Sequence, residues 1–512
     1  MSNGEMAKNF KEHSVAEFFK KNKQMLGFSG KIRSLTTILH EYITNSLDAC
    51  QEAKILPEIY VEINEIEKEN DKYQIIVEDN GPGIPKSHIG KALGMMLSGT
   101  KFHRFIQQRG QQGIGAAGCT MFSMLTVGKP IKVVSGHNKK TIECEVSVDF
   151  KTNKPIIENE KENEGEFEGL KIEAQFGEVK YEKSNYGAYE YIRRTALANP
   201  YLKITFKDPS GQIEIFQRST ELLPPKPVEI LPHPLGIGPH DLLEIAKVEK
   251  KYTKMSSFFQ NRFSRFSASK VAELKEIIPD VDLNISPEKL GWQEAEKITS
   301  AFSKIKWIAP SPDGITPIGQ ELIEKSFINV LNPEMVEVTE RKPKIYRGGI
   351  PFIVEVGIGY GGGIEAAGKK GEVMRFANRS PLLFDAGGCA ITETIKSIDW
   401  KRYDLKNFEE EPIVIVVNIS SVHIPYTSAG KQAISPEEEI VDEIKNAVME
   451  TCRTIQKHIS SKKKEREMEG KRKAISRYIG QFSKDLTELS ESSDSEKIKE
   501  ILESMIGEKY GE

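Results

Sequence analysis

Three polar residues at helical spacing are the first candidates for chemistry. Glu41, Asn45 and Asp48 stand at i, i+4 and i+7, so a helix over residues 34–54 would place them on one face. The rest of that helix is largely apolar, and a polar stripe flanked in this way is expected to line a cavity. A carboxylate can take a proton from an attacking water, and an amide oxygen one turn away can bind Mg²⁺. The stripe suits nucleotide hydrolysis, although an ordinary solvated helix face has the same spacing.

Two glycine-rich segments follow, in which the backbone can approach a ligand closely. The apolar strand 75–79 ends in Asp79 and runs into a turn that contains Gly81 and Gly83, although a plain turn has the same composition. Residues 109–118, with the sequence RGQQGIGAAG, open an apolar helical run. Free N–H groups at the start of a helix bind phosphate, so this segment is a candidate phosphate loop.

Two further glycine patterns match well-known motifs only in part. Residues 113–118 spell the G-x-G-x-x-G of a dinucleotide-binding fold, but polar residues replace the strand that should precede it. Residues 363–370 are similar to a P-loop, yet Lys370 stands where a Ser or Thr should bind Mg²⁺. We therefore read the second pattern as a surface turn.

Length and composition limit the kind of protein. A chain of 512 residues is expected to form two to four domains. Its net charge of −3 excludes a uniformly basic nucleic-acid coat, so any DNA contact must rest on local patches. Five dispersed cysteines, no signal peptide and no apolar stretch long enough to span a membrane indicate a cytoplasmic protein without membrane contact.

The periodicity along the chain predicts a mixed α+β fold. Helical and strand patterns alternate up to about residue 218, and a proline-rich run, 222–234, then breaks the chain. A polar helical stretch carries four phenylalanines at one-turn spacing, Phe258, Phe259, Phe263 and Phe266. Strand patterns return at 351–357 and 413–417, and a long charged helix is predicted from Ser435, its N-cap, to about Lys473.

The order of the motifs resembles that of the GHKL (Bergerat) ATPases, which bind ATP and Mg²⁺. The resemblance implies that Glu41 is the general base and that Asn45 is the Mg²⁺ ligand, with Asp48 as a supporting polar residue. It also implies that Asp79 accepts a hydrogen bond from the adenine amino group and that Gly83 lets the base approach.

The resemblance extends to the lid and to the phosphate loop. Thr100 and Lys101 match the nucleotide-contacting pair of the lid, and Leu170 departs from the Thr that usually joins the adenine-side water network. The residues that would wrap the phosphates are Gly110, Gln111, Gln112, Gly113, Ile114, Gly115, Ala116 and Ala117.

Within this superfamily, the chain resembles the archaeal-type B subunits of type IIB DNA topoisomerase VI. Lys431 matches the lysine with which the transducer domain of that family reaches the γ-phosphate. The other matching stretches are residues 14–28, 233–238, 258–267, 341–355, 374–383 and 399–403.

That resemblance implies a domain order and a set of partners. We expect a GHKL ATPase domain with an N-terminal strap at 1–225, a helix-two-turns-helix domain at 226–306, and an α/β transducer domain similar to ribosomal protein S5 at 307–475, with the long helix. A tail at 476–512 is a candidate contact for the A subunit. The implied assembly is a heterotetramer of two A and two B subunits that dimerises on ATP, encloses double-stranded DNA and lies at the nucleoid.

Three alternatives stay open on the sequence. A MutL-like or Hsp90-like clamp shares the ATP site but has no topoisomerase partner. A sensor kinase would need a phosphoacceptor histidine on a helix before the ATP domain, where only His13 and His40 are available. A structural protein would have no ATP turnover to lose.

Overall fold

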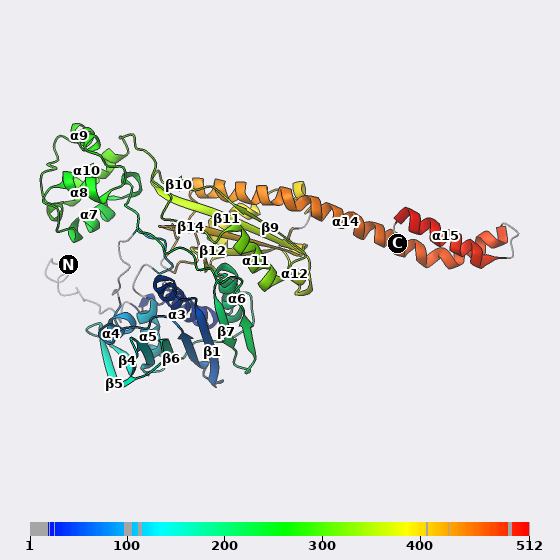
Figure 1. The fold of residues 1–512 in the computed structure, drawn as a ribbon, viewed down its shortest axis with the longest axis horizontal. Helices are drawn as coiled ribbons and strands as arrows, with labels where there is room; N and C mark the ends of the chain where they lie inside the picture. The colour runs from blue at the N-terminus through cyan, green and yellow to red at the C-terminus, as the bar shows by residue number, and fades with distance from the viewer. Residues whose placement is uncertain are drawn as a thin grey trace, which may run out of the picture.

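The chain folds into two α/β units, a small helical unit and a projecting stalk (Figure 1). The computed structural model describes residues 19, 21–24, 26–96, 105–110, 115–405, 408–428, 430–489 and 494–510. The mixed α+β architecture predicted from the sequence is confirmed.

The first unit is built on an eight-stranded sheet of order β5-β4-β3-β6-β2-β1-β7-β8. Its strands are β1 (Glu58–Glu67), β2 (Lys72–Asp79), β3 (Ile131–His137), β4 (Lys140–Asp149), β5 (Lys154–Glu164), β6 (Gly169–Phe176), β7 (Lys203–Lys207) and β8 (Ile213–Phe216). Its helices are α3 (Lys31–Ala53), α4 (Lys86–Gly94), α5 (Gly115–Thr126) and α6 (Ala188–Ala198). All paired strands are antiparallel except β1 and β7, which are parallel.

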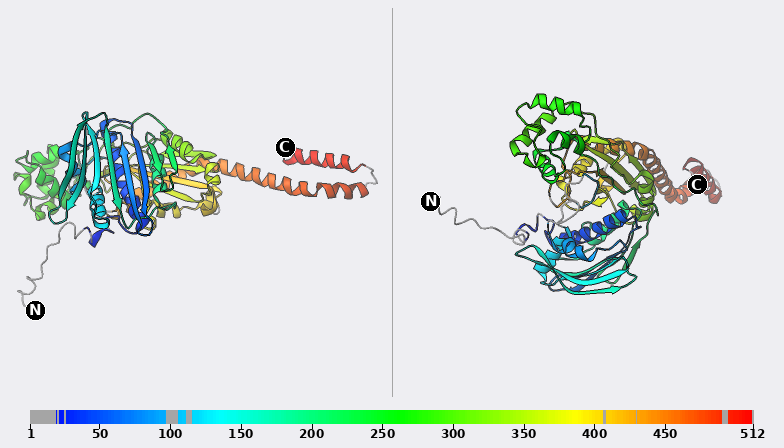
Figure 2. Two further views of the ribbon diagram at one scale, coloured as in Figure 1. Left: turned by 90° about the horizontal axis from the view of Figure 1, so that it is seen from below. Right: turned by 60° about the vertical axis from the view of Figure 1, so that its left-hand side comes forward.

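In the described part of the chain, the helices of this unit cover one face of the sheet. Strand β2 alternates buried and half-buried residues along its length, as expected for a strand with one face packed on a core. The helices α3, α5 and α6 lie on the face directed toward the second α/β unit (Figure 2). The helix that carries the polar stripe is therefore placed between the two units.

The helical unit contains α7 (Pro239–Val248), α8 (Met255–Arg262), α9 (Ala268–Ile277) and α10 (Trp292–Phe302). The four phenylalanines with one-turn spacing form its core together with Phe302 and Trp307. The rings of Phe259 and Phe266 stack with their centroids 5.0 Å apart. Aromatic packing therefore stabilises this small unit.

The second α/β unit has a six-stranded sheet of order β10-β11-β14-β12-β13, in which β9 also pairs with β11. Its strands are β9 (Met335–Glu340), β10 (Lys344–Tyr346), β11 (Ile350–Tyr360), β12 (Glu372–Ala377), β13 (Ser380–Pro381) and β14 (Ile413–Ser421). Its helices are α11 (Gln320–Leu331), α12 (Gly363–Ala366) and α13 (Ala390–Lys396). The central strands β11 and β14 are buried along their whole length, because both faces of this sheet are covered.

The long helix α14 runs from Glu438 to Leu489 and forms the stalk. Its buried residues are concentrated between Ile440 and Ile459, where it packs on the second sheet, and α15 (Ser495–Tyr510) folds back against its far end. The sequence prediction was wrong at both ends. The helix begins three residues after Ser435, which therefore does not cap it. It also continues past Lys473, because the sequence from there up to Leu489 contains no proline and its one glycine, Gly480, is tolerated inside the helix.

Within the part of the chain that the structure describes, none of the helices combines the length and the apolar character needed to cross a membrane.

Candidate nucleotide site

Helix α3 brings Asn45 to the start of the candidate phosphate loop and Glu41 to its end. Both side chains are half-buried, and most of their neighbours on the helix are fully buried. A methyl group added at Gly115 would lie 1.7 Å from Glu41 Oε2, and one added at Gly110 would lie 3.8 Å from Asn45 Oδ1. The carboxylate of Glu41 thus rests directly on the first turn of α5.

Part of the predicted site lies outside the described residues. Gln111, Gln112, Gly113 and Ile114 of the loop are in this group, and so are Thr100 and Lys101 of the lid. The described end of the loop continues into α5, where Ala116 and Ala117 are buried. Residues 105–110 before the loop form no strand, so the site differs from a dinucleotide-binding fold.

Asp79 ends β2 and is almost fully buried. Its carboxylate accepts hydrogen bonds from the Ser46 hydroxyl at 2.5 Å and from the backbone N–H groups of Gly81 at 2.9 Å and Leu170 at 3.2 Å. Burial raises the pKa of Asp79, and these three bonds oppose that rise because they favour the charged form. Leu170 therefore assists Asp79 through its backbone, although its side chain cannot take part in a polar network.

Gly83 adopts a left-handed backbone with φ of +66°. A methyl group at this position would lie 2.1 Å from the carbonyl oxygen of Gly136. The packing of the protein itself thus requires glycine here, in addition to the role in base binding that the resemblance implies.

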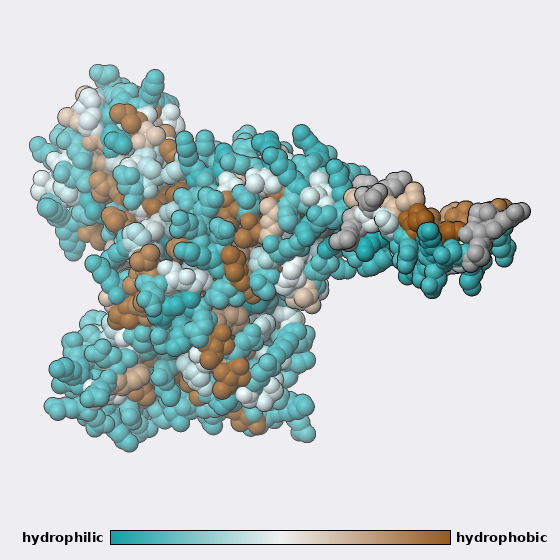
Figure 3. Space-filling model, turned by 45° about the vertical axis from the view of Figure 1, so that its right-hand side comes forward, coloured by the Kyte–Doolittle hydropathy of each residue, from teal (hydrophilic) through white to brown (hydrophobic). Residues whose placement is uncertain are grey.

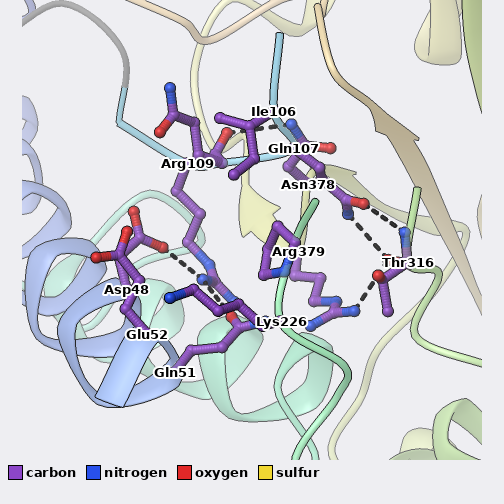
Figure 4. Close-up of a pocket in the computed structure, with 12 residues that line it drawn as sticks. Asp48, Gln51, Glu52, Ile106, Gln107, Arg109, Lys226, Thr316, Asn378 and Arg379 are labelled. Carbon is purple, nitrogen blue, oxygen red and sulfur yellow. Dashed lines mark hydrogen bonds and ion pairs between the residues drawn. The ribbon is translucent and has the colours of Figure 1, made fainter. Parts of the chain in front are cut away.

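The third residue of the polar stripe, Asp48, pairs with Arg109. Its carboxylate is 2.7 Å from Arg109 Nη1, and both side chains are buried. The other guanidinium nitrogen, Nη2, donates to Asn199 Oδ1 at 2.6 Å and to the Tyr201 hydroxyl at 2.9 Å. Arg109 precedes Gly110 directly, so Asp48 supports the phosphate loop through this arginine. A cavity of about 110 Å³ borders the pair (Figure 4).

Lys431 approaches the same place from the second α/β unit. Its ammonium group is 3.5 Å from the carbonyl oxygen of Arg109, although 322 residues separate the two. The next residue, Gln432, anchors this segment, because its Oε1 accepts from the backbone N–H groups of Leu383 and Phe384 at 3.1 and 3.2 Å. The predicted lysine and the start of the predicted loop are thus in contact.

His40 lies beside Glu41 on α3, with its ring 5.7 Å from that of Tyr191 in an edge-on contact. Burial lowers the pKa of His40, and the nearby charge of Lys431 lowers it further. A neutral, packed imidazole on helix α3 is unlike a phosphoacceptor histidine that is exposed on a separate helix.

Carboxylates of the second unit pair with the basic residues of the stalk. Lys462 is 2.7 Å from Glu334, and Lys463 is 2.8 Å from Glu411. These pairs brace the base of α14 against the sheet. In the P-loop-like stretch, Lys369 lies 3.3 Å from Glu372 after the short helix α12, as expected for a surface turn.

An ion-pair cluster in the first half of α6 also joins the two α/β units. Glu190 pairs with Arg193 at 2.8 Å and with Arg194 at 2.6 Å, and Arg194 reaches Glu372 on β12 at 2.8 Å. Burial opposes ionisation of Glu190, but the two arginines outweigh it and lower its pKa to about 2.

The side chains present fit Mg²⁺ together with a phosphate ligand better than a metal centre made by protein alone. Among the described residues, no group of three or more His, Cys, Asp or Glu side chains is placed to hold a metal ion. Mg²⁺ is commonly held by one or two protein oxygens together with phosphates and waters, and Asn45 Oδ1 beside Gly110 offers such an oxygen.

Two protein families match the chain. The family described as "Histidine kinase-, DNA gyrase B-, and HSP90-like ATPase" matches residues 30–153, and the family described as "Topoisomerase VI B subunit, transducer" matches residues 310–471. The fold and the site therefore define an ATPase of the gyrase B and HSP90 type with a transducer domain attached.

Relatives along the whole chain identify the family. The chain is 46% identical to the B subunit of type 2 DNA topoisomerase 6 from Methanothermobacter thermautotrophicus over 503 residues, which cover 97% of this chain and 95% of that protein. It is 42% identical to the protein of the same name from Pyrococcus horikoshii over 551 residues, which cover 99% and 96%. The chain belongs to the family formed by the B subunits of type 2 DNA topoisomerase 6. The resemblance found in the sequence is confirmed, and the MutL-like and Hsp90-like alternatives are not favoured.

Most of these residues could be identified from the sequence, but the role of Arg109 could not. Arg109 stood inside the loop motif, and its position next to Gly110 was the available signal. Nothing in the local sequence marks its pairing with Asp48, 61 residues away.

Proposed function

We propose that the chain is the ATP-operated B subunit of a type IIB DNA topoisomerase. ATP and Mg²⁺ bind between α3 and the phosphate loop, two B subunits then dimerise, and the closed clamp drives one DNA duplex through a double-strand break made by the A subunit. The observation that carries the proposal is the contact between Lys431 of the transducer and the start of the phosphate loop. This contact places a lysine of the transducer, the domain that must move, beside the loop that would bind the phosphates.

The chain's own residues have distinct tasks in this proposal. Glu41 accepts a proton from the attacking water, and its seat against Gly115 fixes its carboxylate at the end of the loop. Asn45 holds Mg²⁺, which when bound offsets charge on the phosphate oxygens. Asp79 accepts from the adenine amino group, and Gly83 leaves room for the base. Thr100, Lys101 and residues 110–117 would enclose the phosphates.

Lys431 is the switch in this proposal. Its ammonium group pairs with the γ-phosphate only while that phosphate is present, so ATP fixes the transducer against the ATPase domain and hydrolysis releases it. A charge-assisted hydrogen bond contributes about 1.5 to 3 kcal/mol, which corresponds to about a tenfold to 100-fold effect on an equilibrium constant.

Further parts of the proposal concern the domains and the partners. We assign the ATPase domain to 1–225, the helix-two-turns-helix domain to 226–306 and the transducer to 307–475. The tail at 476–512 contacts the A subunit in a heterotetramer of two A and two B subunits, in the cytoplasm at the nucleoid. Figure 3 shows apolar surface near the free end of the stalk, where Tyr478, Phe482 and Leu489 are exposed. Such a patch on a charged helix is suited to a protein contact.

Light scattering of the purified chain tests the proposal. The molar mass should double when a non-hydrolysable ATP analogue and Mg²⁺ are added, and Lys431→Ala should weaken this dimerisation at least about tenfold. The control is Lys396→Ala, which removes an exposed lysine at the end of α13 and should dimerise as the wild type does. A chain that stays monomeric with the analogue would contradict the clamp mechanism.

A further inference from the structure

Four consecutive residues at the start of the phosphate loop, 107–110, connect the transducer to helix α3. The side-chain amide of Gln107 makes two hydrogen bonds to the backbone of Thr316, one from Nε2 to the carbonyl at 2.9 Å and one from the N–H to Oε1 at 2.6 Å (Figure 4). The carbonyl of Gln108 accepts from Asn378 Nδ2 at 3.1 Å. Arg109 and Gly110 then turn to α3, so two residues bound by the transducer lead directly into two that lie against Asp48 and Asn45.

The transducer reaches Gln108 with a tight turn, Asn378–Arg379, between β12 and β13. Both residues have positive φ, +48° and +66°, which is uncommon for residues other than glycine. Asn378 is fixed by Ser421, since its Nδ2 donates to the Ser421 carbonyl at 2.9 Å and its Oδ1 accepts from the Ser421 N–H at 2.9 Å. Backbone conformations of this kind persist where the surroundings enforce them, and they are concentrated at functional positions.

Arg379 holds the same turn against both domains. Its guanidinium group donates to the carbonyls of Thr316 and Pro317, each at 2.9 Å, and its own carbonyl accepts from Asn199 Nδ2 at 3.1 Å. Asn199 is also a partner of Arg109, so the turn and the phosphate loop share a neighbour.

The turn is rigidly tied to the centre of the transducer sheet. The N–H groups of Ile318 and Gly319 donate to the buried carboxylate of Glu355 on β11 at 3.1 and 2.7 Å. Asn418 on β14 donates to the same carboxylate at 2.7 Å and accepts from the Arg379 N–H at 3.1 Å. A shift of the sheet relative to the ATPase domain is therefore transmitted to the Gln108 carbonyl without a flexible element between them.

We propose that Asn378 is a positioning residue for ATP hydrolysis. Its amide holds the carbonyl of Gln108, and through it the start of the phosphate loop, in the register that aligns bound phosphate with Glu41 and Asn45. This inference rests on the proposed function and adds to it, because Asn378 acts on the loop whether or not a γ-phosphate is present, whereas Lys431 acts on the phosphate. The transducer thus acts on the nucleotide site at two separate points, the phosphate loop and the γ-phosphate.

The test is Asn378→Asp in the full chain. Aspartate keeps the size, tolerates the left-handed backbone and retains the acceptor for the Ser421 N–H, but it removes the donor to the Gln108 carbonyl and with it the donor to the Ser421 carbonyl. The matched control is Asn329→Asp on α11. Asn329 Nδ2 also donates across the same two domains to a backbone carbonyl, that of Gln217 at 2.7 Å, but this carbonyl belongs to the segment after β8 and not to the loop.

Steady-state ATP hydrolysis and thermal unfolding are measured for both variants. Asn378→Asp should lower kcat about tenfold and leave KM within about twofold of the wild type, since the loop still binds nucleotide but presents it poorly. Asn329→Asp should leave both constants within about twofold. Equal losses of kcat in the two variants, a wild-type kcat for Asn378→Asp, or a change in KM alone would overturn the inference.

A second variant covers the case in which Asn378→Asp does not fold. Asn378→Gly removes the whole side-chain amide, and glycine adopts the left-handed backbone of the turn without strain. A loss of kcat with unchanged KM supports the inference, and wild-type kcat overturns it. The wild-type chain distinguishes failure of the role of Asn378 from failure of the proposed function. If it hydrolyses ATP and dimerises while both variants match it, only the role of Asn378 fails. If it does neither, the proposed function fails as well.

Discussion

The contact between Gly115 and Glu41 leads to a prediction about catalysis with little effect on stability. In Gly115→Ala the new methyl group would lie 1.7 Å from Glu41 Oε2, so the carboxylate must move by roughly 2 Å to reach an ordinary contact distance of about 3.5 Å. The carboxylate is the free end of a flexible side chain, so it can move aside while the backbone stays in place. Alanine also favours helix by up to about 1 kcal/mol over glycine, so the variant should fold.

The expected cost falls on hydrolysis. A misplacement of about 1 Å in a catalytic group can reduce a rate about 100-fold, so Gly115→Ala should lower kcat at least about 100-fold. Steady-state ATP hydrolysis measures this loss, and circular dichroism during heating checks that the melting temperature stays close to that of the wild type.

Two comparisons make the reasoning refutable. Gly110→Ala adds a methyl group at the other end of the loop, 3.8 Å from Asn45 Oδ1, and should cost much less because this distance is an ordinary contact. In a Glu41→Ala background, Gly115→Ala should add no further loss, since the group it displaces is already gone. A Gly115→Ala chain with wild-type kcat, or one that lowers the Glu41→Ala rate by the full factor again, would refute the proposed role of this contact.

Three further predictions concern stability. Gly83→Ala places a methyl group 2.1 Å from the Gly136 carbonyl oxygen at a position with left-handed φ. The substitution should reduce the free energy of unfolding, measured by urea denaturation, by about 2 to 4 kcal/mol, and a change below about 0.5 kcal/mol would contradict the packing argument. Asp48→Ala leaves the guanidinium of Arg109 buried without its carboxylate and should cost about 3 to 5 kcal/mol, with part of this loss recovered when Arg109→Met is added; additive losses in thermal unfolding would argue against the ion pair. The folded pKa of Glu190 is about 2, below the usual 4.5, so the stability that its charge contributes is complete above about pH 4.5 and is lost as the pH falls toward 2. Glu190→Gln should flatten the pH dependence of the free energy of unfolding between these values, and an unchanged profile would exclude this linkage.

The parts of the site that could be predicted from the sequence depend on neighbours in the chain. The helical period aligns Glu41 with Asn45, and glycines mark the turn at 81–83 and the loop at 110–115. Both features follow from local geometry, so they can be predicted from a single sequence. The mixed α+β fold could be predicted for the same reason, since its strands and helices differ in their hydrophobic period.

The remaining parts depend on contacts between distant segments. The i+7 spacing predicted that Asp48 would share a face with Glu41 and Asn45, and all three reach residues 109–115, but the pairing of Asp48 with an arginine 61 residues away could not be predicted from the spacing. Leu170 departs from the expected Thr in its side chain, and the backbone N–H that it donates to Asp79 could not be predicted because it depends on the pairing of two strands far apart in the chain. Lys431 was found by resemblance alone, since no local pattern reports a contact across 322 residues.

The length of α14 gives small rotations a large reach. Beyond Arg466, which pairs with Glu365, the helix has left the sheet, and the 23 residues from Glu467 to Leu489 at about 1.5 Å each form a rod of roughly 35 Å. Each degree by which the transducer turns on the ATPase domain therefore sweeps the end of this rod through about 0.6 Å, so a turn of ten degrees sweeps it through about 6 Å. The stalk therefore acts as a lever arm. A small rotation of the transducer at the nucleotide site displaces the end of α14 by about the width of a polypeptide chain.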